Sequence, residues 1–145
     1  MQSPKGDCEV LLGAVMPFAE QMLKSYGEFL PFGAAMQSDG KVTQVGASDG
    51  NEHPQPADLI ALLKEGFAAE ARNGKYKATA LVYDARYKSA DGSVSDAIAV
   101  ALDHRDNYSV VVFFPYTLRE SSLSIGQARA EAGVNEIFGQ LSSPN

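Results

Sequence analysis

Apolar residues near the N-terminus recur at intervals of three and four positions, which predicts an amphipathic helix over residues 7–29. Asp7 suits the N-cap of this helix, and Gly27 suits its end. Because Pro17 removes one backbone donor and clashes with the preceding turn, we expect a kink or a break there, with the strongest part at 17–27. The apolar positions are Leu11, Leu12, Val15, Phe18, Ala19, Met22, Leu23, Tyr26 and Leu30.

The spacing then changes to the period of strands. Residues 32–37 and 42–46 are predicted to form a hairpin, because Asp39-Gly40 between them supplies the positive φ angles of a tight turn. A polar loop at 47–56 leads into a second helix at roughly 57–73. One face of that helix carries Leu59, Ile60, Leu63, Phe67 and Ala71.

Three more strands are predicted, at 76–87, 96–104 and 108–116. The links between them are short, which nearly forces neighbouring strands to pair antiparallel as a meander. The whole chain, residues 1–145, has the usual length of one domain.

The C-terminal segment, residues 118–145, is predicted to contain a further helix that ends in a frayed tail. Ser124 and Gln127 have the spacing of a capping box. Helical spacing then continues through Ala130, Val134, Ile137, Phe138 and Leu141. Glycines at 126, 133 and 139 weaken this helix, since each costs ~1 kcal/mol relative to alanine.

The last hairpin gives a predicted register. A two-residue loop at Asp106 and Asn107 pairs Arg105 with Tyr108. One face then holds Ile98, Val100, Leu102 and His104 beside Ser109, Val111, Phe113 and Pro115; the other holds Ala97, Ala99, Ala101, Asp103 and Arg105 beside Tyr108, Val110, Val112, Phe114 and Tyr116. The alanines leave room for a helix opposite Phe114 and Val112. Because both faces are largely apolar, both need a cover, from helices on each side or, on one face, from a dimer partner.

The predicted fold class is therefore α+β, in the order α-β-β-α-β-β-β with a final α, around a five-stranded antiparallel sheet. This order matches roadblock and profilin-like folds by analogy of topology. The analogy favours a protein that works through binding partners, although fold alone does not carry function.

Charge and cysteine content narrow the partners. The net charge of −6 comes without a cluster of lysine or arginine, so we expect neither nucleic acid nor an anionic membrane as a partner. Cys8 is the one cysteine, which excludes an internal disulfide, and it reads as an inert thiol. The apolar run at 10–16 lacks a basic lead and is interrupted by Pro17, so we expect no signal peptide and a cytoplasmic protein.

Candidate binding residues lie at the ends of two predicted strands. Asp84 and Arg86 share one strand face, and Asp103 and Arg105 share one face of the next strand, with His104 between them on the opposite face. In a favourable register these charges would cluster as a polar pocket or partner contact; the alternative is a ladder of surface salt bridges. His53 lies in a solvated loop. The sequence shows no catalytic motif, metal-ligand set or cofactor fingerprint, so we expect no catalytic residue, metal or cofactor.

The segment Glu28-Phe29-Leu30-Pro31-Phe32-Gly33-Ala34, together with Asp39-Gly40 and His104-Arg105-Asp106, resembles a group of small uncharacterised bacterial α+β proteins. The resemblance covers the chain up to about residue 116 and implies no activity. The motif that carries the resemblance indicates a structural role: Gly33 permits close packing where the first strand starts.

Two hypotheses follow for function. The first is a non-catalytic bacterial binding protein, for example immunity- or adaptor-like, with a protein partner or a second copy of the chain. The second is a small-molecule binder or enzyme that uses Asp84, Arg86, Asp103, His104 and Arg105.

Overall fold

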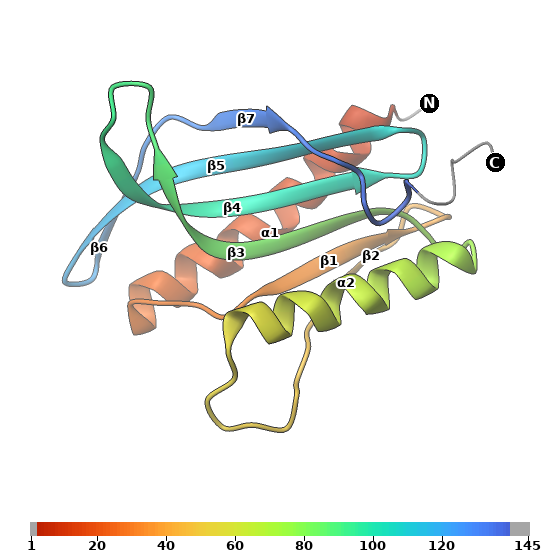
Figure 1. Cartoon of the computed structure of the whole chain (residues 1–145), viewed down its shortest axis with the longest axis horizontal. Helices are drawn as coiled ribbons and strands as arrows, with labels where there is room; N and C mark the ends of the chain where they lie inside the picture. Colours follow the sequence, from red (N-terminus) through yellow and green to blue (C-terminus); the bar gives the residue numbers. More distant parts are fainter. Residues whose placement is uncertain (1–2, 140–145) are drawn as a thin grey trace.

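The structure, a computed structural model, describes residues 3–139 and shows an α+β domain with an antiparallel sheet between two helices (Figure 1). Within those residues the helices are α1 (Pro4–Tyr26) and α2 (Pro56–Arg72). The strands are β1 (Phe32–Gln37), β2 (Val42–Val45), β3 (Tyr76–Lys88), β4 (Val94–His104), β5 (Tyr108–Arg119), β6 (Ser122–Ile125) and β7 (Arg129–Ala132). Their order in the sheet is β2-β1-β3-β4-β5-β6, and β7 also pairs with β5.

The five predicted strands correspond to β1–β5, but the predicted count of five is wrong because the C-terminal segment adds two edge strands. β6 pairs with the C-terminal part of β5, and β7 pairs with its N-terminal part. The helix predicted within 118–145 is therefore absent from the described part of that segment, and residues 140–145 lie outside it. The open edge of β5 offers backbone partners that outweigh a helical tendency already weakened by three glycines.

Helix α1 begins earlier than the sequence predicts. Ser3, not Asp7, is the N-cap, and its side chain accepts a hydrogen bond from the Gly6 amide at 2.9 Å. Pro17 lies inside one continuous helix, so the predicted break does not occur. The buried face of α1, which consists of Leu11, Val15, Ala19 and Leu23, offsets the single backbone bond that the proline removes.

The predicted register of the last hairpin is wrong by one residue. His104 pairs with Tyr108, so the loop has three residues, and Asn107 adopts a φ of 64°. Asparagine tolerates this left-handed conformation better than most residues. As a result the alanines of β4 lie beside Pro115, Phe113 and Val111, not beside Phe114 and Val112.

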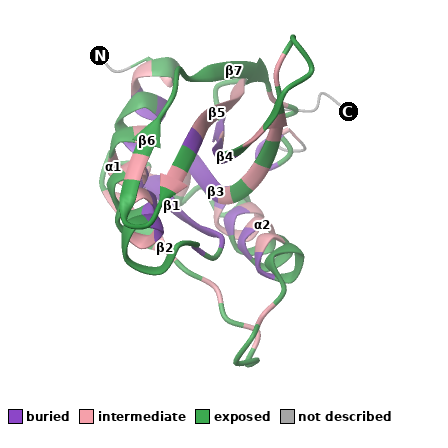
Figure 2. Cartoon of the chain, turned by 90° about the vertical axis from the view of Figure 1, so that its left-hand side faces the viewer, coloured by how far each residue is buried: buried purple, intermediate pink, exposed green. Residues whose placement is uncertain are grey.

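Each face of the sheet carries one helix. Helix α1 packs against Ala80, Val82, Ile98 and Val100 on one face. On the other face α2 places Leu63 and Phe67 against Ala35 and Leu81, and Figure 2 shows buried residues gathered between the sheet and both helices.

Helix α2 lies over β1 and β3, so it does not use the room that the alanines of β4 leave. Instead, the rings of Tyr87 and Phe113 meet across β4, with their centroids 5.0 Å apart. Neither α1 nor α2 has the length and apolar content needed to cross a membrane.

Candidate functional site

The charged residues singled out from the sequence do not form one cluster. Pairing of β3 with β4 places Asp84 opposite Ile98, whereas Asp103 lies opposite Thr79. The two charged pairs therefore sit towards opposite ends of the same two strands. The predicted cluster of Asp84 and Arg86 with Asp103 and Arg105 is wrong because an antiparallel register separates them.

Asp84 and Arg86 lie at an open end of the sheet. Asp84 accepts a hydrogen bond from the Tyr116 hydroxyl at 2.8 Å, and burial raises the pKa of its carboxyl. The guanidinium of Arg86 is 3.8 Å from Asp96, an exposed pair that contributes little. Glu28, Glu52 and His53 line a hollow beside Asp84, with a volume of about 430 Å³. Within residues 3–139, no three or more His, Cys, Asp or Glu side chains are placed so that they could hold one metal ion.

His104 is a structural residue under α1. Its Nδ1 accepts a hydrogen bond from the Asp106 amide at 3.0 Å, so Nε2 carries the proton and donates to Asp7 Oδ2 at 2.8 Å. The Lys77 ammonium is 3.4 Å from the same oxygen. Both Asp7 and His104 are buried, so the pair fastens the first turn of α1 to the sheet. Arg105, in the hairpin loop, donates to the Ser38 hydroxyl at 3.2 Å.

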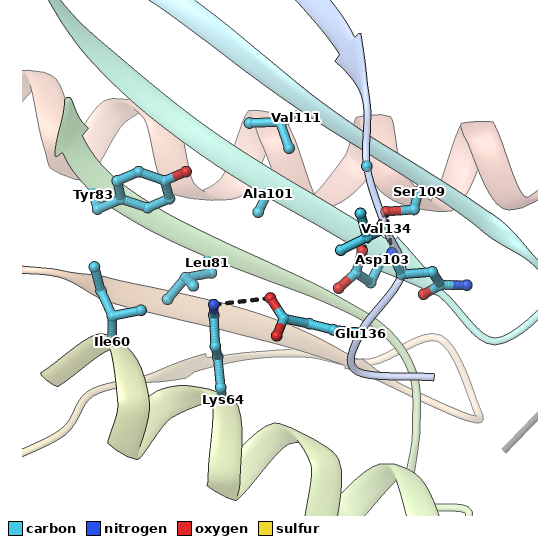
Figure 3. Close-up of a pocket in the computed structure, with 12 residues that line it drawn as sticks. Ile60, Lys64, Leu81, Tyr83, Ala101, Asp103, Ser109, Val111, Val134 and Glu136 are labelled. Atoms are coloured by element: carbon cyan, nitrogen blue, oxygen red, sulfur yellow. Dashed lines mark hydrogen bonds and ion pairs between the residues drawn. The ribbon is translucent and has the colours of Figure 1, made fainter. Parts of the chain in front are cut away.

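Asp103 instead lines a cleft on the α2 face that the sequence did not predict. This C-terminal cleft is bounded by Ile60 and Lys64 of α2, by Leu81, Tyr83, Ala101 and Val111 of the sheet, and by residues 133–136, with Asp103 and Ser109 at one end. Its volume is about 320 Å³. Figure 3 shows Tyr83 at the opposite end from Asp103, with Leu81 and Ala101 between them.

The floor of the C-terminal cleft is apolar because three neighbouring strands place small or aliphatic residues in one row. Leu81, Ala101 and Val111 lie side by side across β3, β4 and β5. The single methyl group of Ala101 leaves the hollow between its larger neighbours. The wall formed by residues 133–136 includes Val134, a residue that is 84% exposed.

The polar end of the cleft is held by a chain of hydrogen bonds. The Ser109 hydroxyl donates to Asp103 Oδ1 at 2.6 Å, and the Asn135 amide donates to the Ser109 oxygen at 3.0 Å. The Asn135 side chain donates to the His104 carbonyl at 3.2 Å. These bonds fix residues 133–136 against the sheet end, and Asn135 has a φ of 51° there.

Asp103 carries an ionisable carboxyl group at a buried position, where its charged form is unfavourable. It is 7% exposed, and burial raises the pKa of its carboxyl, although the hydrogen bond from Ser109 opposes that shift. At the rim, Lys64 Nζ lies 2.8 Å from Glu136 Oε1 and joins α2 to the C-terminal segment (Figure 3). A carboxyl that a protein buries in a cleft at a cost to its charged form is a candidate for function.

We expect Asp103→Asn to raise the thermal unfolding midpoint at pH 7. The folded-state pKa lies above the ordinary aspartate value of 3.8, so the charged carboxylate destabilises the fold at neutral pH, and this cost disappears below 3.8. The gain should therefore shrink as the pH is lowered from 7 towards 3.8 in a series of thermal melts. A variant less stable than the parent at pH 7, with a deficit independent of pH, would show that Asp103 serves stability.

No protein family, curated protein or solved structure matches this chain. The chemistry of the C-terminal cleft is set by its lining, which within the described residues contains no histidine and no cysteine. The Ser109 hydroxyl is held between Asp103 and the Asn135 amide. The lining therefore has the parts of a binding site: an apolar floor, one buried carboxyl and an ion pair at the rim.

The sequence could have found only part of this site. Asp103 is among the residues predicted from the sequence, but the sequence pattern groups its charge with that of Arg105. Nothing in the sequence marks Lys64 or Glu136 as a site residue. Lys64 lies within a helical pattern, and Glu136 lies in a segment for which the sequence also predicts a helix. Gly133 is a further residue of the sequence that relates to this site. A Cβ at this position would collide with the Ser109 side chain, so glycine allows residues 133–136 to approach the sheet this closely.

Proposed function

We propose that this chain is a non-catalytic binding protein that holds a small organic molecule in the C-terminal cleft. The observation that carries the proposal is the cleft itself, about 320 Å³ in volume, with an apolar floor and Asp103 buried at one end. Sites for small molecules are typically concave and mostly apolar, with a few placed polar groups that fix orientation.

The polar side chains of the cleft favour a binding function over a catalytic one, because they already interact with other groups of the protein. A serine nucleophile needs a base that can take its proton and a free path to substrate. Ser109 donates to a carboxylate and accepts from a backbone amide, and Lys64 is engaged by Glu136. Ser109 and Lys64 therefore contribute to the shape and charge of the cleft, but both already have partners within the protein.

We expect Ala101→Leu to weaken ligand binding by about tenfold or more, because the larger side chain fills the floor of the cleft. Ligand-observed NMR with single-ring amines, alcohols and carboxylic acids provides the measurement. Ala132→Leu is the matched control, since Ala132 is exposed on β7 and outside the lining. Equal binding by both variants and the parent, or no binding by any of these compounds, would contradict the proposal.

A second candidate function rests on the part of the same sheet face that lies beyond α2. The rings of Tyr87 and Phe113 meet there without a helix above them. A partner protein, as in an immunity- or adaptor-like role, or a second copy of this chain would cover such a surface. If single-ring compounds do not bind and light scattering finds a dimer, this candidate replaces the first.

A further inference from the structure

We infer that the ligand of the C-terminal cleft is a protonated amine with a compact apolar body, oriented with its ammonium group against Asp103. The inference rests on the proposed binding function and adds the chemical class of the ligand.

The charge of the cleft selects a cation. Two carboxylates, Asp103 and Glu136, face one ammonium, that of Lys64. Lys64 pairs with Glu136 at 2.8 Å, and no cation forms an ion pair with Asp103 in the described part of the chain. Lys64 acts on Asp103 only from a distance, so within the described residues the buried carboxylate has no cation in direct contact, and a ligand ammonium would supply one.

The hydrogen bonds of Asp103 leave capacity for such a group. An ionised carboxylate has about four acceptor positions. The Asp103 carboxylate accepts hydrogen bonds from the Ser109 hydroxyl and from the backbone N–H of Ile137. An ammonium group carries three N–H donors, so it can use the remaining positions and neutralise the charge at the same contact.

The rest of the cleft selects an apolar body of limited size. Leu81, Ala101 and Val111 form its floor, and the exposed side chain of Val134 would be covered by a bound molecule. The volume of about 320 Å³ lies at the lower end of the range of about 300–1,000 Å³ that is typical of small-molecule sites, which favours a compact ligand. Phenethylamine has this size and chemistry and serves as the probe.

Ligands with the same body and a different head group fit less well. A carboxylate would have to draw Lys64 away from Glu136 and would lie near the negative charge of Asp103. An alcohol could donate one hydrogen bond to Asp103 but would leave its charge unmatched.

The test is an amide NMR titration of the folded protein with phenethylamine, phenethyl alcohol and phenylpropionate. We expect phenethylamine to bind about tenfold more tightly than the alcohol, with shifts at Ala101 and Val111, and the carboxylate to bind most weakly. Asp103→Asn should weaken the amine by about tenfold while leaving the alcohol within about twofold. Lys64→Met should act in the opposite direction, strengthening the amine and weakening the carboxylate.

The outcomes separate the two proposals. If the alcohol or the carboxylate binds in the cleft as tightly as the amine, the inferred ligand class is wrong and the binding function stands. If the amine binds but Asp103→Asn leaves its affinity unchanged, the assigned contact is wrong. If none of the three compounds shifts the cleft resonances, the proposed function fails as well. Asp96→Asn, at the other end of the sheet and on the other face, is the charge-matched control and should leave all three affinities unchanged.

Discussion

Replacing Asp7 with alanine is expected to lower the free energy of unfolding by about 3 kcal/mol, because the change breaks a buried, charged contact. Asp7 is 3% exposed and accepts the Nε2 proton of His104 at 2.8 Å. Lys77, with its side chain 17% exposed, has its ammonium 3.4 Å from the same carboxylate. The variant leaves both groups without this partner beneath the first turn of α1.

Urea denaturation of the parent and the variant gives the measurement. Asp106→Ala is the matched control: its carboxylate is 3.9 Å from the same imidazole, but its side chain is 65% exposed, so the expected loss is below ~0.5 kcal/mol. A loss of ~0.5 kcal/mol or less for Asp7→Ala, equal to that of the control, would show that the contact with His104 and Lys77 does not hold α1 to the sheet.

Replacing Gly33 with alanine is expected to destabilise the fold by about 2 to 3 kcal/mol through overpacking. A Cβ on Gly33 would collide with the backbone carbonyl oxygen of Ala80 and would come within 2.8 Å of Phe67 Cζ. The carbonyl cannot retreat easily, because Ala80 lies in β3 between β1 and β4. The close packing that the sequence predicts at Gly33 is confirmed by these contacts.

Gly66→Ala is the control for this effect, and the expected sign is opposite. Gly66 lies in the interior of α2, and an added Cβ meets nothing within 4 Å. Alanine there should stabilise the protein by ~0.8 kcal/mol through helix propensity. Thermal or urea unfolding of the two variants side by side checks the pair, and a Gly33→Ala protein as stable as the parent would contradict the packing described around Phe67.

Most of the fold was predictable because its elements follow clear periods. Helix α2 and strand β3 begin and end within one residue of the predicted limits, and the hairpin turn at Asp39-Gly40 lies where its sequence indicates. The C-terminal segment was predicted wrongly for a physical reason. The residues of β7, Arg-Ala-Glu-Ala, are all exposed and favour helices, so only the unpaired edge of β5 makes them a strand.

The candidate site was less predictable because its contacts join distant parts of the chain. A three-residue loop in place of a two-residue loop moves every pair in the β4–β5 hairpin by one position. The sequence places His104 beside Asp103 in one candidate site, yet the two side chains point to opposite faces of β4. His104 instead contacts Asp7, which lies near the other end of the sequence. Asp103 lines the same cleft as Lys64 and Glu136 only because α2 and residues 133–136 flank one sheet face.

The most direct test of the central claim is a crystal structure of the protein with millimolar phenethylamine. We expect one molecule in the C-terminal cleft, with its nitrogen within hydrogen-bond distance of the Asp103 carboxylate and its ring over Leu81 and Ala101. A cleft that contains only water under these conditions, or a molecule bound with its nitrogen directed away from Asp103, would contradict the account.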